Sequence, residues 1–231
     1  PLTSSAASDV YKRQIFILVF VGSLSLGLWQ IDRGYDKKAL ENIFSQRQSL
    51  PVETNPGMLN EDLYYRNIQI SGFFGKNIFF VDNKLLDGKA GFVVFVPFTT
   101  PGNKKILVSR GWIESSDRNS IPELSLPERK LNIDGMIRPF SKDFVLNDEA
   151  KKIETNFIIQ GLDKELMENL SGAEFLPYVF ELSALSKLSL EPIWKPVSMK
   201  AVRHFGYAVQ WFALSLVVLF GGAYLFTKRN K

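Results

Sequence analysis

The C-terminal apolar segment constrains this chain more than any other feature. No charged residue occurs from Tyr207 to Phe226, and about 20 apolar residues suffice to cross the hydrocarbon core of a bilayer as an α-helix. Tyr207 and Trp211 lie at one end of the segment, where amphipathic rings favour the membrane interface. The segment therefore predicts a transmembrane helix over residues 204–226.

A basic tail follows this helix, with Lys228, Arg229 and Lys231. Such clusters remain on the cytoplasmic side, so residues 227–231 are predicted to be a cytoplasmic tail. His204, the only histidine in the chain, lies at the opposite end of the helix. It is either a metal ligand at the membrane surface or simply a polar residue of a plain anchor at the headgroup level.

The spacing within the helix predicts a packing face. Ala208, Ser215 and Gly222 follow His204 at helical intervals, and small residues on one face allow a second helix to approach closely. A second apolar run, residues 15–31, contains the pair Ser23 and Gly27, which we expect to pack against the small face of the C-terminal helix.

Residues 15–31 are at the short limit for a transmembrane helix. A cleaved signal peptide is the alternative, but its apolar region normally ends in a small-x-small site. This run ends instead in Trp29, Gln30, Asp32 and Arg33, which favours an uncleaved anchor. Residues 1–14 are set apart, because Ser4 to Gln14 resembles the translation of a transposase adapter from sequencing libraries; they are excluded from the topology argument.

Two spans place both chain ends on one side, so the basic tail predicts that the central residues lie outside the inner membrane, in the periplasm. Residues 32–61 are expected to form a helical extension, Asp36 to Gln48, and a proline-containing linker. Residues 62–203 are expected to form the extracytoplasmic β-rich domain. Alternation and turn signals in it predict strands over residues 64–74, 77–82, 91–100, 104–113, 130–139, 156–160, 178–182 and 192–197. A short helix is expected from Asp163, its N-cap, to Leu170. The predicted fold class is an α+β membrane protein in which two transmembrane helices flank a mainly antiparallel β-barrel-like or sandwich domain.

The composition excludes several kinds of catalytic and binding site. The chain has no cysteine and one histidine, which leaves nucleophilic triads and common zinc sites without their residues. The net charge of +4 is scattered along the sequence and does not indicate a nucleic-acid partner. No phosphate-binding glycine loop or paired carboxylates occur in the sequence. An enzyme is therefore not expected.

Three motifs in register resemble one family. Leu26–Arg33 (LGLWQIDR), Leu107–Ile113 (LVSRGWI) and His204–Leu214 (HFGYAVQWFAL) are similar to signatures of the surfeit-locus assembly factors for cytochrome c oxidase. The resemblance extends from about Leu26 to Leu216. The chain departs from the family pattern before the tail histidine, where Val202 and Arg203 replace asparagines, and at Phe205, which replaces a leucine.

The resemblance implies a bacterial inner-membrane assembly factor that binds haem a and assists its insertion into oxidase subunit I, with haem a synthase as a further possible partner beside membrane lipid. His204 would then be the axial ligand of the haem iron. Trp29, Tyr207 and Trp211 would flank the ring, with Gln30 also in the cofactor site. Arg33 and Arg203 would pair with the propionates, although Arg33 is equally well explained by contact with lipid phosphate. Arg110 is expected to be structural, in an ion pair or stacked on a ring. A membrane-anchored scaffold that docks oxidase subunits without a cofactor is the alternative.

Overall fold

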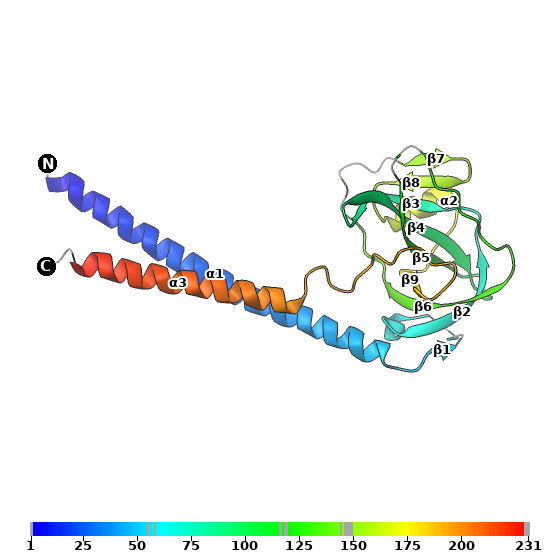
Figure 1. Cartoon of the computed structure of the whole chain (residues 1–231), viewed down its shortest axis with the longest axis horizontal. Helices are drawn as coiled ribbons and strands as arrows, with labels where there is room; N and C mark the ends of the chain where they lie inside the picture. The colour runs from blue at the N-terminus through cyan, green and yellow to red at the C-terminus, as the bar shows by residue number, and fades with distance from the viewer. Residues whose placement is uncertain are drawn as a thin grey trace. The chain divides into compact units, whose positions relative to one another are not determined.

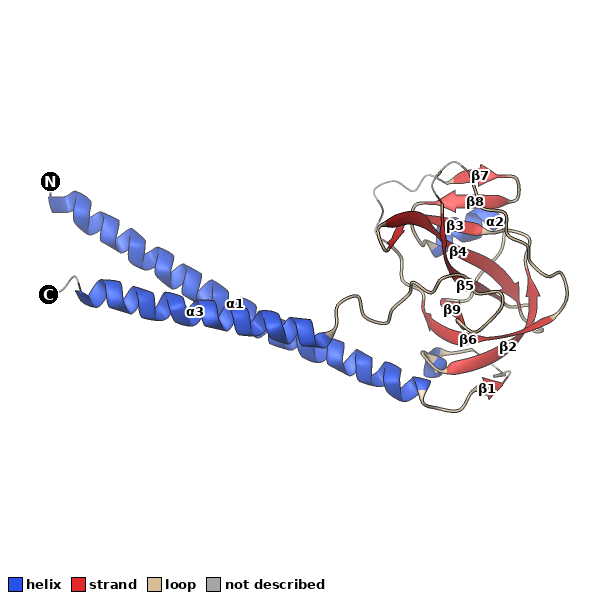
Figure 2. Cartoon of the chain, in the orientation of Figure 1, coloured by secondary structure: helices blue, strands red, loops and turns tan. Residues whose placement is uncertain are grey.

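The structure, a computed structural model, describes residues 2–54, 56–57, 59–115, 117, 120–143, 145 and 150–228. The chain divides into two compact units, of which one comprises Pro1–Ile43 with Pro196–Lys231 and the other Phe44–Lys195. Figure 1 traces the elements along the chain and Figure 2 distinguishes helices from strands.

The first unit is a pair of helices, α1 (Leu2–Gln48) and α3 (Ala201–Lys228), which run antiparallel beside each other (Figure 1). Val10–Gln48 and Ala201–Leu225 are long and apolar enough to span a membrane, and only 11% and 17% of their most apolar windows are buried. This exposure suits helices that face lipid. The predicted helical extension to Gln48 is confirmed as part of α1. The basic tail at 229–231 lies outside the described residues, and the adapter origin of residues 1–14 stays a prediction.

Small residues bring the two helices together, as the sequence predicts. Ser23 is 3% exposed and Ala208 is fully buried. A Cβ atom added to Gly27 would lie 2.5 Å from the ring of Phe212, and one added to Gly34 would lie 2.5 Å from the ring of Phe205. Each phenylalanine therefore occupies the space that a glycine leaves on the facing helix. Along α3 the buried small residues recur every seven positions, the repeat of left-handed helix packing, at Ala201, Ala208, Ser215 and Gly222.

The second unit is built on a closed ring of five strands: β2 (Asn67–Phe74), β6 (Leu131–Pro139), β9 (Tyr178–Leu182), β5 (Lys105–Glu114) and β4 (Lys89–Thr99). Each strand pairs with the next, and β4 pairs back to β2 (Figure 2). A sheet extends from β4 through β3 (Phe79–Leu86), β8 (Asn156–Ile159) and β7 (Lys151–Ile153), while β1 (Glu53–Thr54) adds to β2. Among the described pairings between two strands only β1–β2, β3–β8 and β5–β9 are parallel, and Tyr64 forms an isolated parallel bridge with Ile137 of β6. The fold is therefore a mixed, mainly antiparallel barrel.

The barrel interior is filled by alternate residues of its strands, because successive side chains point to opposite faces. Ile68 and Ile70 of β2 and Ile106 and Val108 of β5 belong to this cluster, together with Phe180 of β9. Strand β4 is buried on both faces from position 92 to 98, as its continuous apolar run predicts. Its second face packs in a cluster with α2 (Lys164–Ser171) and the outer sheet.

Two hairpin turns join β4 to the strands on either side of it. The β3–β4 hairpin turns at Asp87 and Gly88, which have φ of 49° and 79°, the left-handed values that a tight hairpin needs. The β4–β5 hairpin turns at residues 101–103, where the Asn103 amide donates to Thr100 O over 2.9 Å. The N-cap of α2 is confirmed, since Asp163 accepts a hydrogen bond from the Leu166 amide at 3.2 Å.

The strand predicted over residues 192–197 is wrong. Pro192 and Pro196 have no amide donor and interrupt a ladder, and only Glu191 forms an isolated bridge, with Trp112. The Trp194 ring stacks on Tyr65, with centroids 6.2 Å apart and planes inclined by 17°. The short elements β1, β7 and the 3-10 helix Glu61–Leu63 were not predicted, because two or three residues show no periodicity.

Candidate functional site

His204 is placed by the first turn of α3. This helix begins at Ala201, whose amide donates to Glu41 Oε1 of α1 over 3.2 Å. A carboxylate at a helix N-terminus satisfies an unpaired amide and faces the positive end of the helix dipole. Sequence analysis missed Glu41, because a cap supplied by another helix leaves no local signal.

The structure brings His204 together with Gln30 of α1. The Nδ1 atom of the histidine lies 2.8 Å from Oε1 of the glutamine, although the two residues are 174 positions apart in the sequence. The histidine is only 6% exposed. Its other ring nitrogen, Nε2, is buried and has no hydrogen-bond partner among the described residues.

This arrangement leaves one nitrogen of His204, Nε2, able to act as a metal ligand. A buried polar atom without a partner is costly, and an imidazole nitrogen with a free lone pair is the usual ligand that histidine offers to metals. In its donor chemistry, His204 would therefore fit as a ligand of haem iron. The Nε2 atom is covered in this structure, so the surrounding side chains have to move before a ligand reaches it.

The other predicted cofactor residues lie at the surface of the helix pair. Trp29 is 49% exposed and Tyr207 is 44% exposed, while Trp211 is half-buried. In the described part of the chain these three rings form no ring–ring pair with one another. Arg33 lies 3.5 Å from Asp36 of the same helix in an exposed ion pair, which contributes little. Arg203 is exposed on α3. Their proposed haem contacts stay predictions.

Arg110, in the barrel unit, has a structural environment. It is 6% exposed and its Nε donates to Leu188 O over 2.7 Å. Within the described residues it has no acidic partner, and its Nη1 has no hydrogen-bond partner. Burial lowers the pKa of this guanidinium. The expected ion pair or ring stack is replaced by a bond to a carbonyl.

The segment that leads to α3 is fixed by the same motif. Gly111 has φ of +110°, and a Cβ there would lie 2.6 Å from Glu191 O. The neighbouring Trp112 exchanges two backbone hydrogen bonds with Glu191, at 2.7 and 3.1 Å, and its indole donates to Lys84 O at 3.0 Å. The glycine therefore permits a close backbone approach, and the segment that approaches is the chain before α3.

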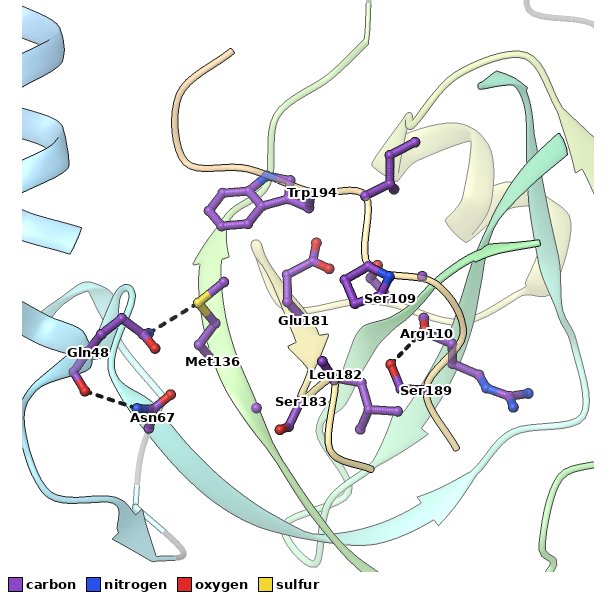
Figure 3. A pocket seen from close by; sticks show the side chains of 15 residues that line it. Gln48, Asn67, Ser109, Arg110, Met136, Glu181, Leu182, Ser183, Ser189 and Trp194 are labelled. Atoms are coloured by element: carbon purple, nitrogen blue, oxygen red, sulfur yellow. Dashed lines mark hydrogen bonds between the residues drawn. The ribbon is translucent and has the colours of Figure 1, made fainter. Parts of the chain in front are cut away.

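A cavity of about 240 Å³ lies beside this segment in the barrel unit (Figure 3). Gln48 lines it and donates to Met136 Sδ at 3.4 Å. Glu181 also lines it, and its carboxylate forms an ion pair with Arg138, in which Arg138 Nε lies 2.7 Å from Glu181 Oε1. The guanidinium of Arg138 also lies 5.3 Å from the centroid of the Trp194 ring. Sequence analysis did not predict this cavity, because separate segments meet in it.

The fold and the histidine together define a class: a two-helix membrane-type chain that carries a five-stranded barrel between its helices and one buried histidine on the second helix. The model of the SURF1 family matches residues 17–216. The chain belongs to the SURF1 family.

Relatives span bacteria and eukaryotes. A SURF1-like protein of Rickettsia felis is 27% identical over 94% of this chain and 96% of the relative. The human Surfeit locus protein 1 is 24% identical over 92% of this chain and 76% of the relative. The cytochrome oxidase assembly protein SHY1 of Saccharomyces cerevisiae is 32% identical over 52% of this chain and 34% of its own length. The family predicted from the three motifs is thus confirmed.

Proposed function

We propose that this chain is an assembly factor for cytochrome c oxidase that binds haem a through His204 and assists its insertion into subunit I. The name of the yeast relative supports the assembly role. The observation that supports haem binding is the imidazole itself, with Nδ1 engaged by Gln30 and Nε2 without a partner among the described residues. Membrane-facing helices would place this nitrogen where an amphiphilic porphyrin rests.

In this proposal His204 holds the iron. Ring surfaces for the macrocycle come from Trp29, Tyr207 and Trp211. The propionates pair with the guanidinium groups of Arg33 and Arg203. Bound haem a would supply an iron centre that accepts the imidazole nitrogen as a ligand. The chain's own part is to hold this ligand in place at the membrane surface, not to catalyse a reaction. We further propose a bacterial inner-membrane location with the barrel in the periplasm and the C-terminus in the cytoplasm, and we propose haem a synthase as a further partner.

The absorption spectrum tests this function. The protein is purified from haem-a-producing cells, and its Soret band is compared with that of His204→Ala. Loss of bound haem in the variant with unchanged membrane insertion supports the proposal. Gln210→Ala, which changes an exposed polar residue of the same helix, is the matched control and should retain the band. A variant without His204 that keeps its haem and its spectrum would refute the role of His204.

A cofactor-free scaffold is the second candidate, and one observation favours it. The Nε2 atom is covered, and an interhelical hydrogen bond alone gives the His204–Gln30 pair a packing role, worth about 0.6 kcal/mol in membrane helices. A wild-type protein that still supports oxidase assembly but carries no stoichiometric Soret band would establish the scaffold.

A further inference from the structure

The contact between Gln30 and His204 fixes more than the position of a ring. The glutamine atom involved is the carbonyl oxygen Oε1, 2.8 Å from Nδ1. The amide of Gln30 turns its oxygen, not its NH2 group, toward the ring. A carbonyl oxygen can only accept a hydrogen bond, so in this amide orientation Nδ1 carries the proton. In the neutral ring the second nitrogen, Nε2, then holds the lone pair.

We propose that Gln30 is a positioning residue that locks His204 in the Nδ1–H tautomer and so presents the Nε2 lone pair to a metal. This inference rests on the proposed function for the use of that lone pair, but the tautomer itself belongs to the metal-free protein. Free histidine prefers the other tautomer, with the proton on Nε2, in which Nδ1 is the free nitrogen. Metal-binding histidines commonly donate their second ring N–H to an oxygen that fixes tautomer and orientation.

The packing of the helices explains why Gln30 can hold the ring. It lies on α1 between Gly27 and Gly34, and each of these glycines receives a phenylalanine ring of α3. The two helices therefore approach each other closely on both sides of the Gln30–His204 contact. His204 is only 6% exposed, so water competes little for the hydrogen bond of Nδ1–H. An aliphatic residue at position 30 would leave this donor without its acceptor.

The tautomer is measurable because the chain has one histidine. Histidine labelled with ¹⁵N in the ring gives signals from His204 alone in the full-length, metal-free protein in lipid nanodiscs. At a pH where the ring is neutral, we expect a protonated Nδ1 and an unprotonated Nε2. Gln30→Leu should shift the ring to the Nε2–H form, whereas Gln30→Glu keeps an acceptor and should keep the wild-type tautomer.

Titration with haem a gives the second readout. We expect Gln30→Leu to weaken binding about 10- to 100-fold, the usual effect of losing such a supporting hydrogen bond, and Gln30→Glu to restore it. A wild-type ring protonated on Nε2, or a Gln30→Leu ring with an unchanged tautomer, would overturn the inference. If Gln30→Leu does not fold, the wild-type spectrum and Gln30→Glu still decide it.

The two proposals fail differently. If the wild type shows Nδ1–H and Gln30→Leu shifts it, but neither protein binds haem a, the positioning role stands and the haem function fails. If the wild type binds haem a through His204 and Gln30→Leu binds equally well with an unshifted tautomer, the haem function stands and the role of Gln30 fails.

Discussion

The glycine–phenylalanine contacts of the helix pair allow a quantitative test. Gly27→Ala adds a methyl group whose carbon would lie 2.5 Å from the Phe212 ring, closer than two carbon atoms can approach. The ring or the helix therefore has to shift. Gly22→Ala, on the same helix, is the matched control, because a Cβ there has nothing within 4 Å.

The expected change in the stability of the helix pair is the sum of two opposing effects. Replacing glycine by alanine in a helix gains about 1 kcal/mol in propensity, and this gain is common to both variants. Overpacking costs about 1–3 kcal/mol, and it applies to Gly27→Ala alone. The helix pair of Gly27→Ala should therefore be less stable than that of Gly22→Ala by about 1–3 kcal/mol.

Energy transfer between two dyes measures the separation of the helices. The chain has no cysteine, so Leu24→Cys and Leu214→Cys provide two specific labelling sites on exposed positions of α1 and α3. Titration with sodium dodecyl sulphate in mixed micelles gives the midpoint at which transfer is lost. Gly27→Ala should reach it at a lower detergent fraction than the control.

A compensating change makes the reasoning refutable. Phe212→Leu, combined with Gly27→Ala, should recover part of the loss, with a coupling of about 0.5–3 kcal/mol between the two sites. Identical midpoints for Gly27→Ala and Gly22→Ala, or no coupling with Phe212→Leu, would show that the glycine does not set the approach of the helices.

Three further outcomes are expected. A reporter that is active only outside the cytoplasm should be active when inserted at 56–57 and silent when fused after Lys231; the reverse pattern would invert the proposed orientation. Gly111→Ala should lower the Tm of the barrel in calorimetry at a cost of roughly 2 kcal/mol or more, because φ is +110° and Glu191 O would lie 2.6 Å from the new carbon; an unchanged Tm would contradict this. Desolvation raises the pKa of Asp163, but the bonds from the Lys142 ammonium and a backbone amide outweigh it, so the pKa lies below its ordinary value. The folded state then binds fewer protons than the unfolded state, so this stability is present above the unfolded pKa and is lost as pH falls through the folded pKa. Urea unfolding of the wild type and Asp163→Asn between pH 7 and 3 should show a smaller acid-induced loss in the variant, and parallel pH profiles would refute the assignment.

Much of the fold was predictable because its signals are local. The uncharged stretch that begins at Tyr207 identifies α3. Alternation of polar and apolar residues over positions 64–74 identifies β2, whose residues are buried at every second position from Ile68 to Gly72. Turns such as Asp87–Gly88 carry their own residue signature. The small residues Ser23 and Ala208 even predicted which helix faces meet, since close approach requires small side chains at helical spacing.

What could not be predicted depends on contacts between distant segments. The closure of the sheet into a barrel rests on the β2–β4 pairing at Phe73 and Phe74, and alternation does not say which strands become neighbours. The Glu41 cap and the cavity beside Trp194 likewise need the folded chain. The sequence predicted His204 and Gln30 as site residues from separate motifs, but only the fold shows them in contact.

That contact joins the two helix motifs of this chain. His204 alone is a polar residue near the end of α3, with either ring nitrogen free to hold the proton. Gln30 alone is an amide on α1, and the sequence assigns it to the cofactor site without saying what it contacts. Placed 2.8 Å apart in a low-dielectric helix interface, they specify which nitrogen is protonated and which is left without a partner. The glycines on either side of Gln30 make this distance possible, because a side chain at Gly27 or Gly34 would collide with α3. The ligand is therefore a property of the helix pair, and a chain with the histidine but without the glutamine or the glycines would not present the same nitrogen.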